Sequence, residues 1–156
     1  MQIRPTVPDD RQAIQAILHG TESFTEREIE IALEVFDIHF GDPEEDYELY
    51  TCVDDRNVVL GYVCIGPTPL TEGTWDLYWI AIGPAAQGKG VGKRLTEFIE
   101  ERIRSARGRL IVAETSSTGA YDRARKFYLR NGFREIATLH DYYRTGDHMF
   151  IYGKYL

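Results

Sequence analysis

The sequence has few cysteines and no long hydrophobic run. Cys52 and Cys64 are its only cysteines, and they form no CxxC pair of the kind that binds metals or transfers electrons. Charges or glycines interrupt every apolar run well before the roughly 20 residues that a membrane helix requires. The first residues, MQIRPTVPDD, lack the apolar core of a signal peptide. We therefore expect a cytoplasmic, reduced protein that does not bind membranes.

Positive charge is also scarce. The 156 residues include 18 Lys and Arg against 25 Asp and Glu, which gives a formal net charge of −7. Nucleic-acid binding depends on many cationic contacts to phosphate, so we expect no nucleic-acid partner. The four histidines show no metal-ligand spacing, and we expect no metal. A chain of this length with no linker can bury one substantial core, which predicts a single domain over residues 1–156.

The N-terminal part predicts a short extended segment followed by two amphipathic helices. The first helix spans DDRQAIQAILHG, with Asp9 or Asp10 as its N-terminal cap. The second begins at Thr25, has Glu28 three positions later as in a capping box, and ends near Gly41. Its acidic face is most simply interpreted as solvated.

The rest of the chain alternates between strand and helix patterns. YELYTCVDDRNVVLGYVCIG predicts a β-hairpin, and TWDLYWIAI predicts a strand at the centre of the sheet. A helical spacing over residues 90–107, followed by the strand RLIVAET, predicts a parallel β-α-β unit. AYDRARKFYLRNG predicts a further helix that Asn131 and Gly132 close. Two closing strands, FREIATL and HMFIYGKYL, flank the polar loop HDYYRTGD, so the fold class is α+β.

A glycine-rich segment, QGKGVG at residues 87–92, lies between the predicted central strand and the following helix. Glycines before a helix let a phosphate approach unpaired N–H groups at the positive end of the helix dipole. An ATP-type P-loop would need Ser or Thr at position 90, where this chain has glycine. A dinucleotide fingerprint would need glycine where Lys93 stands. Both of these interpretations are therefore weak.

The same segment is similar to the acyl-CoA loop of the GNAT superfamily of N-acyltransferases. That signature is Gln or Arg, two residues, Gly, one residue, and Gly or Ala, and Gln87, Gly90 and Gly92 match it in register after IAIGP. A second block, ARKFYLRNGF, resembles the helix of that family with its alanine, aromatic-tyrosine pair and closing Gly-Phe. The resemblance covers nearly the full length. It implies the GNAT fold, a mixed and mostly antiparallel central sheet with a splayed parallel strand pair and about four flanking helices.

The resemblance implies an acetyl-CoA-dependent N-acetyltransferase. Such an enzyme transfers the acetyl group by direct attack of a primary amine, on a small metabolite or a peptide N-terminus, and needs no metal. The alternative is a non-catalytic acyl-CoA-binding sensor or regulatory domain. Dimers are common in the family, which leaves a homodimer open for this chain.

The resemblance also places the acetyl-CoA. In the family it lies between two splayed strands, which here end near Ile82 and Glu114, and it contacts mostly backbone. The strand edge is expected to pair with the pantetheine arm, and the loop is expected to receive the pyrophosphate. The residues expected at acetyl-CoA are Ile80, Ala81, Ile82, Gln87, Gly88, Lys89, Gly90, Val91, Gly92, Lys93, Tyr121 and Tyr128.

Two side chains are candidates for catalysis. An alkyl amine with a pKa of about 10.4 is almost entirely protonated at pH 7, so the reaction needs a base. Glu114, at the end of LIVAE, is the best candidate to take the proton directly or through water, the alternative being that it caps the following loop. Tyr128 matches the tyrosine that in many family members protonates the departing thiolate. The alternative for Tyr128 is a buried tyrosine whose hydroxyl is satisfied by the protein.

The amine acceptor is the part of the function that the sequence determines least. The tail HDYYRTGDHMFIY is similar to that of ribosomal-protein alanine N-acetyltransferases, but those carry a pantetheine-contacting asparagine where this chain has the longer TSSTGAYDRA, so the resemblance does not extend to peptide specificity. Tyr121 either replaces that asparagine as a contact or packs against the helix. Acceptor contacts are expected from the first two helices and from the loop around Tyr142, Tyr143 and Asp147. Strict alternation along the central strand places Asp76 and Tyr78 on one face and Trp79 on the other. Asp76, Tyr78 and Trp79 are therefore candidates to line the floor of the acceptor site, but they cannot all face the amine.

Overall fold

The computed structural model describes residues 1–42 and 44–156, in which seven strands form one sheet. The strands are β1 (Gln2–Pro5), β2 (Glu48–Val53), β3 (Val59–Pro67), β4 (Thr74–Ile82), β5 (Leu110–Ser116), β6 (Arg134–Arg144) and β7 (Asp147–Tyr155). Their order in the sheet is β1-β2-β3-β4-β5-β7-β6, so β4 is the middle strand, as predicted. Every neighbouring pair is antiparallel except β4 and β5, which are parallel.

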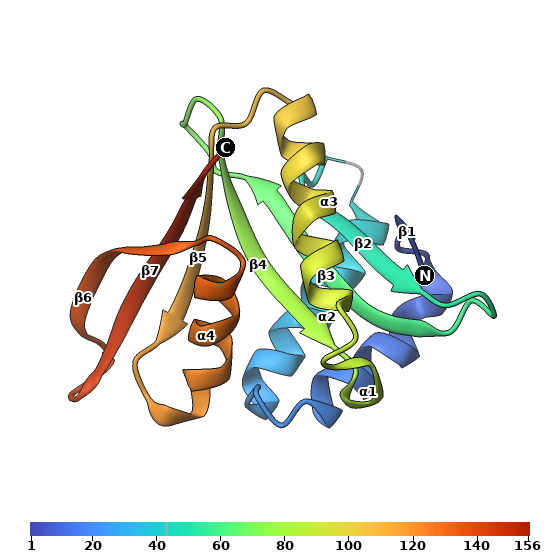
Figure 1. Ribbon diagram of the computed structural model, residues 1–156, viewed down its shortest axis with the longest axis horizontal. Helices are drawn as coiled ribbons and strands as arrows, with labels where there is room; N and C mark the ends of the chain where they lie inside the picture. Colours follow the sequence, from blue (N-terminus) through green and yellow to red (C-terminus); the bar gives the residue numbers. More distant parts are fainter. Residues whose placement is uncertain (43) are drawn as a thin grey trace.

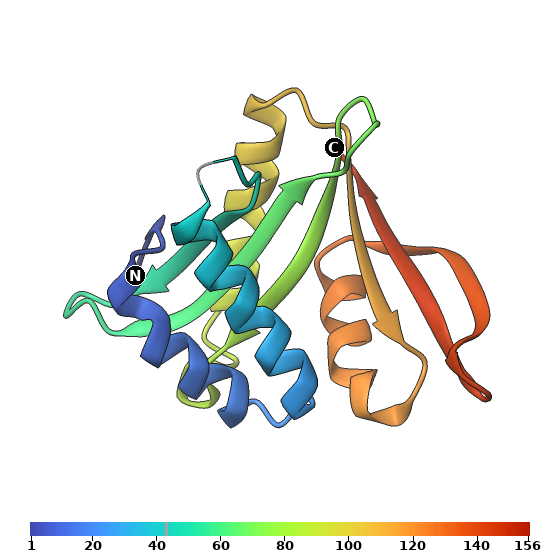
Figure 2. The same ribbon diagram turned by 180° about the vertical axis from the view of Figure 1, so that it is seen from behind.

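Four α-helices cover the two faces of this sheet. They are α1 (Arg11–Gly20), α2 (Glu26–Gly41), α3 (Val91–Ser105) and α4 (Asp122–Arg130), with 3-10 turns η1 (Pro8–Asp10), η2 (Pro84–Ala86) and η3 (Gly119–Tyr121). Helices α3 and α4 lie on one face, and α1 and α2 lie behind it (Figures 1 and 2). No helix in the described ranges is both long and apolar enough to cross a bilayer. The expected α+β GNAT fold, with its mixed sheet and four helices, is confirmed.

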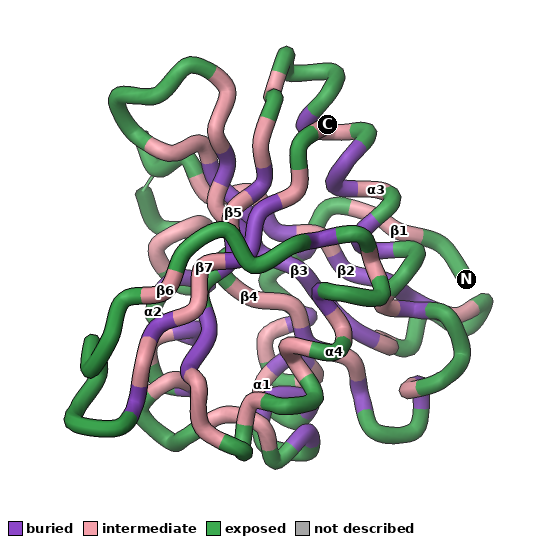
Figure 3. The backbone as a smooth tube through the Cα atoms, turned by 60° about the vertical axis from the view of Figure 1, so that its left-hand side comes forward, coloured by how far each residue is buried: buried purple, intermediate pink, exposed green. Residues whose placement is uncertain are grey.

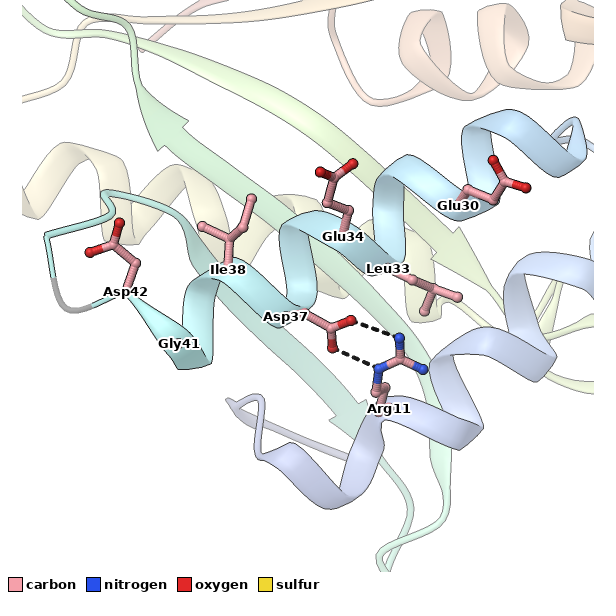
Figure 4. A pocket seen from close by; sticks show the side chains of 8 residues that line it. All are labelled: Arg11, Glu30, Leu33, Glu34, Asp37, Ile38, Gly41 and Asp42. Atoms are coloured by element: carbon pink, nitrogen blue, oxygen red, sulfur yellow. Dashed lines mark hydrogen bonds and ion pairs between the residues drawn. The ribbon is translucent and has the colours of Figure 1, made fainter.

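Helix α2 begins with the predicted capping box. Thr25 Oγ1 accepts a hydrogen bond from the Glu28 N–H at 3.2 Å, and a Glu28 oxygen accepts one from the Thr25 N–H at 2.7 Å. On the outside of the helix pair, Arg11 of α1 donates two hydrogen bonds to Asp37 of α2, at 2.7 and 2.8 Å (Figure 4). The surface hollow beside this ion pair has a volume of about 640 Å³ and shares no lining residue with the cavity described below.

The predicted cap of α1 is wrong in its chemistry. Asp10 does occupy the position before the helix, but its side chain makes no hydrogen bond to the helix N–H groups. The carboxylate instead accepts from Arg4 at 2.7 Å and from the Val7 N–H at 3.0 Å. Because the charged guanidinium is the stronger donor, it holds the carboxylate against β1 and away from the start of α1.

Strand β4 contains a β-bulge at Tyr78. In its register with β3, Cys64 is opposite Trp79 and Ile65 is opposite Leu77, which leaves Tyr78 as an extra residue. Leu77 therefore packs in the core under α3, and Trp79 packs in the core under α1 and α2. The alternation predicted for this strand is wrong beyond residue 77, because the extra residue turns Trp79 to the opposite face.

Strands β4 and β5 diverge immediately before this bulge. They pair only at Thr74–Leu110, Trp75–Ile111 and Asp76–Val112, although both strands continue beyond those residues. Figure 1 shows the two strands separating along the rest of their length. The splayed parallel pair is thus confirmed, and the β5 side of residues 77–82 has no strand partner.

The C-terminal hairpin is longer than predicted. Residues 140–144 belong to β6, where the sequence predicts a polar loop, and the turn is reduced to Thr145 and Gly146. Strand β6 is at the sheet edge and is exposed along nearly its whole length (Figure 3). At the end of α4, Asn131 is the cap and Gly132 follows with φ +82°, as predicted.

Candidate functional site

A cavity of about 660 Å³ lies where β4 and β5 diverge. Its walls come from the α1–α2 connection, the start of α2, strand β4, residues 86–93, strand β5 and helix α4. Every residue that the sequence analysis assigned to acetyl-CoA or to catalysis lines this cavity except Lys89, which is exposed outside it. Segments that are far apart in the sequence are therefore brought together at one place.

The loop before α3 presents bare backbone to the cavity. Gly88 has φ +74° and Gly90 has φ +82°, and a Cβ added to either would meet no atom within 4 Å. The first backbone hydrogen bond of α3 runs from the Arg94 N–H to Gly90 O at 3.0 Å, so the N–H groups of residues 91–93 have no partner within the helix. They are available to an anion at the positive end of the helix. Gln87 Nε2 donates to Ile82 O at 3.2 Å and ties the loop to the end of β4.

Gly92 has a different requirement. A Cβ at this position would lie 2.7 Å from Cε2 of Phe127, which belongs to α4. The absence of a side chain at Gly92 therefore allows α3 and α4 to approach each other at the mouth of the cavity. This glycine of the motif serves helix packing, whereas Gly88 and Gly90 leave open space for a ligand.

The strand edges in the cavity also offer unpaired polar groups. Residues 77–82 of β4 lack a strand partner on the β5 side, so an extended polar chain could add there as a strand does. On β5, Thr115 is 4% exposed and its Oγ1 has no hydrogen-bond partner among the described residues. Open space at the loop glycines and an orphaned hydroxyl on the wall fit a long ligand with phosphate and amide groups, as acetyl-CoA is.

Glu114 reaches the cavity from the middle of β5. Its neighbours Ala113 and Thr115 are buried, whereas the Glu114 side chain is accessible and makes no ion pair within the described ranges. Partial burial in the cleft raises the pKa of the Glu114 carboxyl, and the negative charge of Asp76 raises it further. Asp76 is itself held by Thr68, whose hydroxyl donates to it at 2.7 Å. The cavity thus contains an unpaired carboxylate that is more basic than an ordinary glutamate.

Tyr128 lies on the opposite wall, on α4. Its ring is buried and stacks on Tyr152 with centroids 5.5 Å apart, and it contacts Phe133 at 5.4 Å. The hydroxyl makes no hydrogen bond with any described residue, although Tyr128 lines the cavity. Burial raises the pKa of Tyr128 to about 12, so the phenol stays protonated at neutral pH.

Tyr121 bridges the cavity mouth to α2. Its hydroxyl donates to Glu28 Oε1 at 2.5 Å. The pKa of Tyr121 is raised by burial and by this hydrogen bond to the carboxylate. On the other side, Arg123 donates to Gln87 Oε1 at 3.2 Å. Sequence reasoning missed Glu28 as a residue of the site because it interpreted the acidic face of α2 as solvated, although the capping box did fix Glu28 in the first turn.

Of the residues expected near the acceptor, Tyr78 and Trp79 line the cavity, whereas Asp76, Tyr142, Tyr143 and Asp147 do not. Tyr143 belongs to β6, and its pKa is raised to about 12 by partial burial and by the charges of Glu114 and Glu28, among others. Asp147 is buried and accepts a hydrogen bond from Ser116 Oγ at 2.5 Å, so it fastens the hairpin to β5. His148 Nδ1 accepts from the backbone of the same hairpin. The described residues contain no group of three or more His, Cys, Asp or Glu placed to hold a metal.

Known proteins share both the sequence pattern and the fold. The family model of the acetyltransferase (GNAT) domain matches residues 45–135. N-alpha-acetyltransferase RimI of Mycobacterium tuberculosis is 33% identical over 99 residues, which are 62% of this chain and only 58% of that relative's length. A GNAT-family protein from Desulfovibrio desulfuricans is 37% identical, with 99% of this chain and 98% of that chain covered and a TM-score of 0.92. An aminoglycoside 6'-N-acetyltransferase complexed with coenzyme A has a TM-score of 0.75 at 16% identity, with 99% and 97% covered. The chain belongs to the GNAT family of acetyltransferase domains.

Proposed function

We propose that this protein transfers the acetyl group of acetyl-CoA to a primary amine, on a small metabolite or a peptide N-terminus. The observation that carries the proposal is the single cavity at the strand divergence, which joins bare loop N–H groups to Glu114 and to the unpaired phenol of Tyr128. Both ends of the chain contribute strands to the same sheet, and this supports one catalytic domain over residues 1–156.

The backbone would hold the co-substrate. The N–H groups of residues 91–93 would receive the pyrophosphate. The edge of β4 at Ile80, Ala81 and Ile82, which has no strand partner on the β5 side, would supply strand-type hydrogen bonds for the pantetheine arm. Lys93, on the same wall, adds positive charge next to the loop. When bound, acetyl-CoA supplies an acyl group activated as a thioester.

Two side chains would move protons. Glu114 accepts the proton of the amine, directly or through water, and its raised pKa brings it closer to the pKa that general-base catalysis needs near pH 7. Tyr128 keeps its proton because its pKa is raised to about 12, and its free hydroxyl donates to the departing sulfur. The phenol is a weaker acid than the thiol that it would form, whose pKa is about 8.5, so its contribution would rest on its placement in the cavity.

The relatives point to two acceptor classes. The name of the Mycobacterium tuberculosis relative refers to α-amino groups, and that of the coenzyme A complex refers to a small aminoglycoside. The first is the more similar in sequence, which favours a peptide N-terminus. Phe24, in the α1–α2 connection, and Glu28, at the start of α2, line the same cavity.

The test is thiol release from acetyl-CoA in the presence of a panel of primary amines and short peptides, together with calorimetric titration of CoA. Turnover with at least one amine, identified by product mass, supports the proposal. CoA binding without turnover on any amine or peptide would favour the sensor alternative. Absence of CoA binding by the folded protein would refute both.

A further inference from the structure

The charges that line the cavity are segregated. Its cationic side chains, Lys93, Arg123 and Arg130, all come from α3 and α4. Its carboxylates are Glu28, at the start of α2, and Glu114, on β5. Ala113, the residue before Glu114, packs in the same core as Tyr128 of α4, so alternation turns Glu114 to the other face of the sheet. The α3–α4 side therefore suits the anionic co-substrate. The α1–α2 side has no cation among its lining residues.

Glu28 carries a charge that the protein does not neutralise. One of its oxygens accepts from the Thr25 N–H at 2.7 Å and the Thr25 hydroxyl at 2.9 Å, and the other accepts from Tyr121 at 2.5 Å. All three donors are neutral, and Glu28 makes no ion pair within the described ranges. Hydrogen bonds of this kind orient the carboxylate and leave its full negative charge directed at the cavity.

The second carboxylate, Glu114, lines the same cavity as Glu28. The charges of both carboxylates contribute to the raised pKa of Tyr143 on β6. Phe24, Tyr78 and Trp79 also line the cavity, and aromatic rings attract cations that lie over their faces. Thr115 of β5 also lines the cavity, and its buried Oγ1 has no hydrogen-bond partner among the described residues.

Glu28 has no ionic partner within the described ranges, and such a carboxylate attracts a cation at short range. This inference rests on the function proposed above, in which Glu114 serves the reacting amine. Glu28 is then available for a different positive charge. We propose that Glu28 binds a second cationic group of the acceptor, and that the acceptor is an amine with a further ammonium or guanidinium group a few bonds away. An acceptor whose amine has a carboxylate at that distance is disfavoured, because the α1–α2 side offers no cation to receive it.

Three probes of equal chain length test this substrate class: 1,4-diaminobutane, butylamine and 4-aminobutanoate. Their kcat/KM values are measured at the same pH and low salt by thiol release. We expect the diamine to exceed butylamine by about tenfold, as a partly screened charge pair allows, and 4-aminobutanoate to be the poorest. The preference should shrink as salt is raised, because the pair is partly exposed to solvent. Equal values for the three amines would overturn the inference and leave the proposed function intact.

The matched variants are Glu28→Gln and Glu34→Gln. Glutamine serves in a capping box as glutamate does, so Glu28→Gln removes the charge while keeping the start of α2. Glu34 lies on the same helix outside the cavity, and its replacement changes the net charge equally. We expect Glu28→Gln to abolish the diamine preference and Glu34→Gln to preserve it. A preference that survives in Glu28→Gln, with an unchanged melting temperature, would refute the role of Glu28.

A binding measurement separates this inference from the proposed function. Calorimetric titration of 1,4-diaminobutane into the protein without acetyl-CoA should show binding that weakens about tenfold in Glu28→Gln and not in Glu34→Gln. If no amine is acetylated but this binding pattern is found, the cation site stands and the proposed function fails. If acetylation occurs and the diamine binds both variants equally, the cation site fails. Should Glu28→Gln not fold, the salt dependence of the wild-type preference decides alone, and a salt-independent preference refutes the inference.

Discussion

Replacing Tyr128 by phenylalanine removes one hydroxyl and leaves the ring. The ring is buried against Tyr152 and Phe133, and the hydroxyl makes no hydrogen bond with the described residues. Its loss therefore breaks no protein contact, and we expect the free energy of unfolding to change by less than about 1 kcal/mol. CoA affinity should likewise stay nearly the same, because the co-substrate is held mainly by backbone.

Turnover should respond very differently. A positioned general acid contributes typically about 10²-fold to 10⁴-fold, which is about 3 to 5 kcal/mol of activation free energy. Because burial raises the pKa of Tyr128 to about 12, the phenol remains protonated across the usual assay range. The rate loss in Tyr128→Phe should therefore be similar at pH 7 and pH 9. The assay is turnover at saturating substrate, with a CoA titration and a melting curve on the same sample.

The matched control is Tyr152→Phe. Tyr152 belongs to the same buried cluster and is stacked on Tyr128, but it does not line the cavity. The control should keep wild-type turnover within about threefold. A loss below about threefold in Tyr128→Phe, with the chemical step rate-limiting, would mean that solvent or another residue protonates the sulfur. Equal losses in the two variants would show that the effect comes from packing.

Two further substitutions test the loop and the base. Gly90→Ala should weaken CoA binding about tenfold or more, because the added methyl group fills space next to the α3 N–H groups. The control is Gly146→Ala: Gly146 has φ +80° against +82° for Gly90 and equally open surroundings, so the change should cost similar stability and leave CoA affinity unchanged. Equal CoA affinities in the two variants would contradict the assignment of the loop to CoA binding. Asp76→Asn removes a charge that raises the pKa of Glu114, so the acidic limb of kcat/KM should move to lower pH, and a limb that stays in place would show that Glu114 is not the titrating base.

Local patterns made the helices and the position of the glycine loop predictable. Thr25 and Glu28 fix the start of α2 through a side-chain exchange that spans four residues. The glycines of residues 87–92 mark the end of a strand and the start of a helix, and both boundaries are as predicted. Such features depend on neighbours in the chain, and the sequence contains all of their partners.

Contacts between distant segments were not predictable in the same way. The hydrogen bond from Tyr121 to Glu28 joins residues 93 positions apart, and nothing near either residue indicates the other. Strand β6 was predicted too short because its second half is polar and rich in tyrosine. An edge strand with one paired side and two largely exposed faces tolerates such residues, so its composition resembles that of a loop.

The bulge at Tyr78 helps to shape the cavity, and the alternating pattern of the sequence gives no sign of it. With strict alternation, Trp79 would share the face of Leu77 and would pack under α3. The extra residue instead turns Trp79 to the α1–α2 face. A bulge also bends and twists its strand. Because β5 has no matching bulge, β5 cannot stay in register with β4 beyond Asp76. The one extra residue opposite β3 therefore both turns Trp79 to the α1–α2 face and leaves the β4 edge without a partner beyond Asp76.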